Sequence, residues 1–113
     1  MIYVKINGTE YEAEVAGRLF ERDFGGRESK AITTRELTAA EAMELFRDDT
    51  PWSIVERVWV EDEETHERHE EVTEWDNSAY SVAGDVTDHR DGRVTVKMGK
   101  PTDLELAYEE LYG

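Results

Sequence analysis

The longest apolar run of the chain, residues 52–60, limits the folds that the sequence can adopt. It reads Trp-Ser-Ile-Val-Glu-Arg-Val-Trp-Val and is rich in the β-branched and aromatic residues that favour strands. Residues 61–71 follow with seven carboxylates in eleven positions, and a β-favouring segment around Val72 and Trp75 comes next. We interpret residues 51–75 as a central strand, a charged excursion into solvent and a return strand.

The length and composition of the chain fit one domain, residues 1–113, because a chain of this size can bury roughly two-thirds of its unfolded surface. The absence of cysteine excludes disulfides and thiol-ligated zinc or iron–sulfur sites. No apolar run approaches the roughly 20 residues of a membrane-spanning helix, and a strand pattern starts at the N-terminus. We therefore expect a soluble intracellular protein, and no motif leads us to expect a cofactor.

The net charge of −15 is concentrated in one part of the sequence. Residues 61–91 hold 2 basic and 12 acidic side chains, so this segment alone carries −10. Such a field repels nucleic acids and anionic membranes, whose binding requires Lys and Arg. The charge either keeps the protein soluble or attracts a basic protein partner, so we expect no direct nucleic-acid binding and no membrane contact.

The N-terminal segment predicts a β-hairpin. Asn7-Gly8 lies between two alternating runs, and both central residues of a type I′ turn need positive φ. A two-residue loop aligns Lys5 with Glu10, which places opposite charges across the ladder. The same register pairs apolar residues on the other face: Ile6 with Thr9, Val4 with Tyr11, and Ile2 with Ala13.

Two capping boxes predict two helices. Thr38 with Glu41 opens a helix over about residues 38–47, and Thr102 with Glu105 opens one over about residues 102–112. Each helix has an apolar stripe at i, i+3, i+4 and i+7. The stripes are Ala39, Ala42, Met43 and Phe46 in the first helix, and Leu104, Ala107, Tyr108 and Leu111 in the second.

Further strands are predicted over residues 29–37 and over residues 93–98, the latter with Val94, Val96 and Met98 inward. Residues 77–87 are predicted to form a strand pair or one bent strand, with a bulge or bend at Gly84. Strands outnumber helices, and most neighbours are joined by hairpin-type turns. We therefore predict an α+β fold, a mainly antiparallel sheet of five to seven strands with the two helices packed on it.

Two spaced sets of side chains could bind a metal ion. Glu63, His66 and His69 would share one face of a helix, but the segment lacks the His-Glu-x-x-His spacing, and a solvated loop explains them better. Asp85, Asp88 and Asp91 lack the order of an EF-hand loop, so we interpret them as a polar hairpin turn. We predict no metal site, and a metal-dependent enzyme is only a third hypothesis.

Catalytic motifs are not found in the sequence. No serine lies in a Gly-x-Ser-x-Gly context, and Gly25-Gly26-Arg27 lacks the lysine of a phosphate-binding loop. With 28 acidic residues, some pair of carboxylates always looks suggestive. We therefore expect no catalytic residues and no enzymatic activity.

The tryptophans provide the more specific functional hypothesis. Alternation along residues 52–60 places Trp52, Ile54, Val58 and Val60 on one face and Val55 and Trp59 on the other. Both faces are then apolar, so one can be covered by a helix and the other by a partner. We predict partner binding through the aromatic side chains Trp59 and Trp75 and through the acidic side chains Glu61, Asp62, Glu63, Glu64, Glu67, Glu70 and Glu71.

Several short segments resemble a group of small uncharacterised proteins of bacteriophages and prophages of gut Firmicutes. The segments are Asn-Gly-Thr-Glu-Tyr at 7–11, Gly-Arg-Glu-Ser-Lys-Ala-Ile-Thr at 26–33, Trp-Ser-Ile at 52–54, Asp-Asn-Ser at 76–78, and 92–102. The resemblance implies a phage-borne, non-enzymatic protein from the tail or other structural genes, located in the bacterial cytoplasm or in the virion. It implies no catalytic residues, and residues 61–71 have no counterpart in it.

The leading hypothesis is a protein-binding or assembly module, for which a homo-oligomer is also conceivable. The alternative is an acidic nucleic-acid mimic that inhibits a host DNA-binding or defence protein. Its motive is the charge of residues 61–91, and it predicts binding that weakens steeply with salt.

Overall fold

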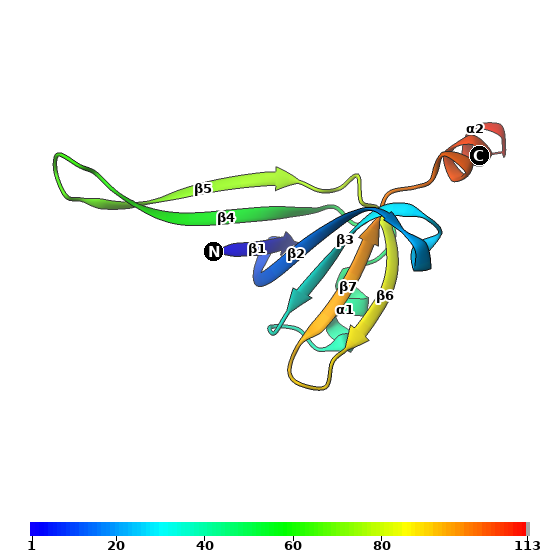
Figure 1. Ribbon diagram of the computed structural model, residues 1–113, viewed down its shortest axis with the longest axis horizontal. Helices are drawn as coiled ribbons and strands as arrows, with labels where there is room; N and C mark the ends of the chain where they lie inside the picture. The colour runs from blue at the N-terminus through cyan, green and yellow to red at the C-terminus, as the bar shows by residue number, and fades with distance from the viewer. Residues whose placement is uncertain (113) are drawn as a thin grey trace.

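The computed structural model describes residues 1–112 and confirms the α+β class with a fully antiparallel sheet (Figure 1). The strand order is β5-β4-β1-β2-β3-β7-β6. Neither helix of the described part is long and apolar enough to span a bilayer. The elements are β1 (Ile2–Ile6), β2 (Thr9–Glu21), a 3-10 helix (Arg22–Phe24), β3 (Arg27–Thr34), α1 (Ala39–Leu45), β4 (Trp52–Glu61), β5 (Arg68–Asp76), β6 (Val82–Asp88), β7 (Val94–Gly99) and α2 (Asp103–Tyr112).

The β1–β2 hairpin confirms the predicted turn and register. Asn7 and Gly8 both have positive φ, of 52° and 79°, as a type I′ turn requires. Lys5 lies opposite Glu10, and the ladder ends where Tyr3 meets Glu12. The expected pairing of Ile2 with Ala13 is wrong. Ile2 pairs with Glu56 of β4, and Ala13 opens the ladder between β2 and β3 by pairing with Thr34.

The sheet is curled, because its two outermost strands follow each other in the chain. Only residues 77–81 connect β5 to β6, and five connecting residues span at most roughly 20 Å. The connection is held against β4. The Asn77 N–H donates to the carbonyl of Trp52 at 2.9 Å, and the Trp52 indole N–H donates to the carbonyl of Tyr80 at 3.1 Å.

The core lies on the inner side of this curl, where α1 packs against β6 and β7. The predicted capping box is present, with Thr38 Oγ1 accepting from Glu41 N and Glu41 Oε1 accepting from Thr38 N. Met43 was expected inward but is exposed, because the short helix turns this position to solvent. The buried cluster comprises Val4, Ile6, Ala13, Ile32, Leu37, Ala42, Phe46, Trp52, Val94, Val96 and Met98.

The predicted bend at Gly84 is confirmed as an irregularity in the pairing of β6 with β7, between Ala83 and Val86. A Cβ at Gly84 would lie 2.7 Å from the ring of Phe24, so the glycine allows this ring to approach the strand. The 3-10 helix after β2 therefore packs against β6, the edge strand of the sheet.

The second helix differs from the expectation that it covers the sheet. α2 begins at a capping box, in which Thr102 and Glu105 bond reciprocally, but none of its residues is buried. In Figure 1 it projects from one end of the molecule, opposite the long β4–β5 hairpin. These two projections contribute to overall extents of 60 × 34 × 24 Å.

Candidate protein-binding site

The β4–β5 hairpin extends beyond the rest of the sheet and forms an arm, here defined as residues 57–72. β4 pairs with β1 only as far as Glu56, which lies opposite Ile2. Beyond this point β4 has β5 as its one described neighbour, and Figure 1 shows the hairpin projecting to the left of the body. The arm therefore exposes both of its faces to solvent.

Apolar side chains occupy both faces of the hairpin, as the alternation along residues 52–60 predicted. Residues directly opposite each other share a face. Trp75 lies opposite Ile54, so it shares a face with Val58, whereas Trp59 lies diagonally next to Val72 on the other face. Trp59 is 61% exposed and Trp75 is 48% exposed. The structure thus places the two predicted tryptophans on opposite faces of the same hairpin, Trp59 in the arm and Trp75 at its base.

The turn of the arm is shorter than the charged excursion expected over residues 61–71. β5 already starts at Arg68, so only residues 62–67 form the connection. Asp62 organises it, because its carboxylate accepts from the N–H groups of Glu64 and Thr65 at 2.8 and 3.0 Å. These bonds lower the pKa of Asp62, with the Thr65 N–H as the largest cause. The predicted order of strand, excursion and return strand is therefore present, but the return strand starts earlier and the connection is shorter.

All seven predicted acidic side chains lie on the arm, but they differ in their surroundings. Glu70 and Glu71 point to opposite faces, since they pair with Trp59 and Val58. Glu61 lies 3.8 Å from His66, and Asp62 is used by the turn. The other three, Glu63, Glu64 and Glu67, are exposed in the turn of the arm, and no ion pair is found for them within residues 1–112.

Arg57 anchors the arm to the body. Its guanidinium donates to both carboxylate oxygens of Glu10, at 2.8 and 2.6 Å, and to Glu70 at 2.6 Å. The hydrogen bond from Arg57 lowers the pKa of Glu10 below its usual range. Lys5 turns instead to Glu74 at 3.4 Å, so the cross-strand register predicted for Lys5 and Glu10 holds while their charges are paired elsewhere.

Arg68 adds a cation to the face of the arm that carries Trp59. Its guanidinium carbon lies 5.8 Å from the centre of the Trp59 ring, within the range of a cation–π contact. Sequence reasoning overlooked Arg68 and Val72 as site residues. The signal that could have found them was the pairing of the two strands, because hairpin register places both beside Trp59.

The absence of a metal site stays a prediction, but the structure shows where the possible metal ligands lie. Glu63 and His66 lie in the turn and His69 in β5, so they do not share a helical face. No cluster of three such ligands is found in the part of the chain described. Asp88 and Asp91 accept backbone N–H bonds in the β6–β7 turn, as expected for a polar hairpin turn, while Asp85 lies within β6.

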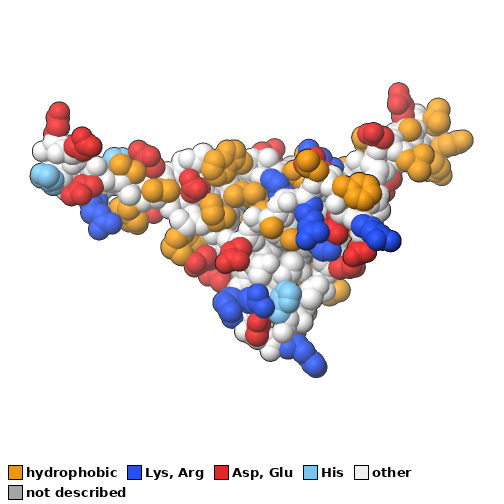
Figure 2. Space-filling model, viewed as in Figure 1, with side chains coloured by type: hydrophobic (Ala, Val, Ile, Leu, Met, Phe, Trp, Pro, Cys, Tyr) orange, Lys and Arg blue, Asp and Glu red, His pale blue; other side chains and the backbone are white. Residues whose placement is uncertain are grey.

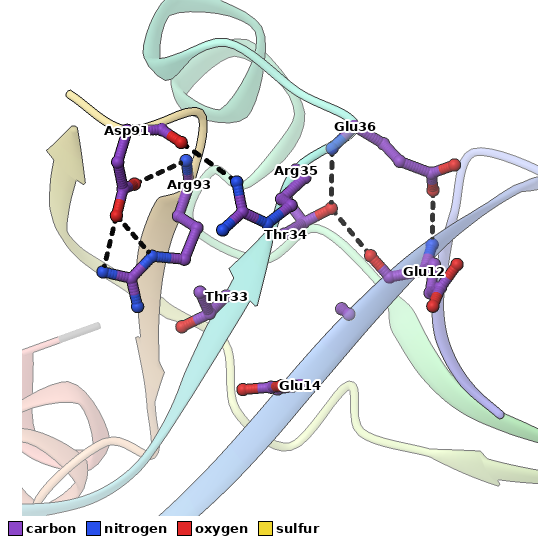
Figure 3. Close-up of a pocket in the computed structure, with 9 residues that line it drawn as sticks. Glu12, Glu14, Thr33, Thr34, Arg35, Glu36, Asp91 and Arg93 are labelled. Atoms are coloured by element: carbon purple, nitrogen blue, oxygen red, sulfur yellow. Dashed lines mark hydrogen bonds and ion pairs between the residues drawn. The ribbon is translucent and has the colours of Figure 1, made fainter. Parts of the chain in front are cut away.

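A shallow groove of about 570 Å³ lies where β2 passes from β1 to β3 (Figure 3). Its polar groups largely bind one another. Arg93 pairs with Asp91 at 2.8 Å, and Arg35 donates to the Asp91 carbonyl at 3.0 Å. The Glu36 carboxylate accepts from the Glu12 N–H. These contacts include a hydrogen bond to the Glu12 N–H, at the point where the β1–β2 ladder ends and the β2–β3 ladder begins. The groove is therefore lined by a structural hydrogen-bond network and is not the candidate site.

No protein-family model, no curated protein and no solved structure matches the chain.

Proposed function

We propose that this protein is a non-enzymatic protein-binding or assembly module and that its contact surface is the arm together with Trp75 at its base. The observation that carries the proposal is a projecting hairpin with a large exposed aromatic side chain on each face, Trp59 and Trp75. A tryptophan contributes a large apolar area, and tryptophan and arginine are the side chains most enriched where interfaces gain their affinity. Figure 2 shows apolar and charged side chains interspersed along the hairpin.

The charge of the arm selects the kind of partner. Residues 57–72 hold seven carboxylates and two arginines, and Arg57 is already paired within the molecule. A partner with an apolar patch and a basic rim complements this surface, whereas an acidic protein or a nucleic acid is repelled. The resemblance to phage proteins supports a partner among tail or other structural proteins, and thus a place in the host cytoplasm or the virion.

The proposal is tested by binding to the purified products of the neighbouring genes. We expect one of them to bind the full chain, and Trp59→Ser to weaken that binding by about tenfold or more. Met43→Ser is the matched control, because Met43 is also an exposed apolar residue but lies on α1. Equal binding by the Trp59 and Met43 variants would remove the arm from the interface.

A second candidate function is an acidic nucleic-acid mimic that blocks a basic host protein. It is favoured by the exposed carboxylates of Glu63, Glu64 and Glu67 at the tip. In that case the triple change to Gln abolishes binding to a basic nuclease, and the affinity of the unaltered protein falls steeply with salt. Trp59→Ser then has little effect, which separates this function from the first.

A further inference from the structure

The end of the molecule opposite the arm carries a second exposed apolar surface, made by two elements. One is α2. The other, here called the β2 tip, is residues 18–22, the end of β2 with the first residue of the 3-10 helix. Arg18 pairs with Ser29, and Ser29 also pairs with Gly99, which lies shortly before α2. Arg27 joins α2 to the 3-10 helix that follows the tip, with Nη1 2.6 Å from Glu105 Oε1 and Nε 2.9 Å from the Phe24 carbonyl. The tip and the helix therefore lie at the same end of the body.

One side of α2 is apolar and has no described neighbour, while the other side carries the carboxylates together with Leu106. Helical spacing places Leu104, Ala107, Tyr108, Leu111 and Tyr112 on one side. All of them are exposed, including Tyr108 at 66% and Tyr112 at 75%. A ten-residue helix is marginal in water by itself and depends on tertiary packing of its apolar face. Burial of this face against another surface would therefore stabilise the helix.

The β2 tip exposes two large apolar side chains between two arginines. Leu19 is 85% exposed and Phe20 is 70% exposed, where the pairing of β2 with β3 becomes irregular. The Arg18 side chain is 71% exposed, with only a long contact of 3.7 Å to Glu21. Arg22 is exposed and has no ion pair among the described side chains. The tip is therefore an apolar patch between two arginines, with the exposed Asp23 next to Arg22.

The charges of α2 complement those of the tip. The helix carries four carboxylates and no basic residue, and Glu109 and Glu110 lie in its last turn. Carboxylates are unfavourable there, because the helix dipole already makes that end negative, and nearby cations stabilise it. Arg18 and Arg22 are suited to this role, and within residues 1–112 no ion pair joins either of them to α2 of the same chain.

We propose that two copies of this chain form a symmetric dimer in which α2 of each copy packs on the β2 tip of the other. Leu19 and Phe20 contact the apolar face of the helix, and Arg18 and Arg22 lie beside Glu109 and Glu110. Since both elements lie at one end, a two-fold axis through that end makes the contact twice. A pairing of α2 with α2 is disfavoured, because it brings Asp103, Glu109 and Glu110 near the same carboxylates of the other copy, whereas Glu105 is already bound by Arg27.

The area available is sufficient for such a contact. Phe20, Tyr108 and Tyr112 are 70%, 66% and 75% exposed, so at about 200 Å² per aromatic side chain they offer roughly 400 Å² in each copy. The exposed leucines Leu19, Leu104 and Leu111 add to it, so two copies approach the ~1,200 Å² at the lower end of specific interfaces. The dimer would present two arms pointing away from the shared end, which goes beyond the proposed function and does not rest on it.

The test is a charge exchange followed by light scattering or sedimentation over about 1 µM to about 1 mM of the full chain. We expect the mass to rise from 13.0 kDa towards twice that value. The double variants Arg18→Glu/Arg22→Glu and Glu109→Arg/Glu110→Arg each dimerise about tenfold or more weakly. An equimolar mixture of the two variants recovers dimerisation, because each contact then joins an acidic with a basic element. The matched control, Arg47→Glu on the surface after α1, dimerises as the unaltered chain does.

Three results would overturn the proposal. The first is a monomer at every concentration. The second is a double variant at Arg18 and Arg22 that dimerises as well as the unaltered chain, as an α2–α2 contact would allow. The third is a mixture that fails to recover the dimer. The strand signal in circular dichroism checks that the sheet of each variant is folded. The change at Glu109 and Glu110 places cations at the C-terminus of α2, which favours the helix, so this substitution does not itself unwind α2.

Discussion

The guanidinium of Arg57 and the carboxylate of Glu10 form a two-pronged ion pair, with Nη2 2.6 Å from Oε2 and Nε 2.8 Å from Oε1. Arg57 belongs to β4 and Glu10 to β2, and β1 lies between these strands. The pair therefore spans a strand and joins the base of the arm to the body. Glu70, bound by the same guanidinium, extends the connection to β5.

The first prediction concerns this anchor. Arg57→Met keeps the apolar stem of the side chain but removes the guanidinium, so Glu10 and Glu70 lose their shared partner. We expect amide hydrogen exchange to become faster across residues 57–72, whereas exchange in β3 and β7 stays slow. The measurement is exchange followed by mass spectrometry, with Arg90→Met as the control. Unchanged exchange in the arm would show that strand pairing alone holds it.

The second prediction separates the core tryptophan from the surface tryptophan. Trp52 is buried between Phe46 and Tyr80, with both ring centres 6.3 Å away, whereas Trp59 is exposed. Trp52→Ala should lower the free energy of unfolding by about 3–5 kcal/mol, because it leaves a large cavity. Trp59→Ala should change it by less than about 1 kcal/mol, as is usual for surface positions. Urea denaturation measures both, and similar losses would show that the arm belongs to the core.

Local sequence signals were sufficient for much of the fold. The turn at Asn7-Gly8, the capping boxes at Thr38 and Thr102, and the inward residues of β7 each depend on neighbours in sequence. Because turn geometry and helix capping are local, these predictions needed no knowledge of the sheet order.

Long-range arrangement could not be predicted in the same way. The pairing of Arg57 with Glu10, and the end of the β1–β2 ladder at Tyr3, depend on which strands become neighbours. The length of the arm depends on β5 starting at Arg68, although residues 68–71 look like a charged loop in sequence. The apolar stripe of α2 predicted a helix packed on the sheet, but no residue of α2 is buried. An apolar pattern indicates which face of a helix favours burial, and it does not identify the surface that buries it.

The third prediction concerns Gly84, where the ring of Phe24 approaches the β6 backbone. A Cβ there would lie 2.7 Å from this ring and 3.2 Å from Lys97 Cβ. Gly84→Ala should lower the free energy of unfolding by about 1 kcal/mol, since the ring can move only partly. Gly17→Ala is the control, because a Cβ at Gly17 meets nothing within 4 Å. If thermal denaturation gives equal shifts for both variants, the contact with Phe24 does not constrain β6.

The last prediction concerns the pH dependence of the α2 anchor. The hydrogen bond from Arg27, helped by the Thr102 N–H, lowers the pKa of Glu105 to about 2. A carboxyl whose pKa is depressed in the folded state stabilises it above the unfolded value, and this contribution is lost as the pH falls towards the folded value. The start of α2 should therefore stay attached at neutral pH and loosen between about pH 4.5 and about pH 2. NMR titration of the Glu105 side chain, with the Thr102 amide as a second probe, measures this transition.

Arg27→Met should move the Glu105 midpoint up towards pH 4.5, the usual value of a glutamate, because the main cause of the shift is gone. If the midpoint stays near 2 in that variant, the capping box rather than Arg27 holds the carboxylate.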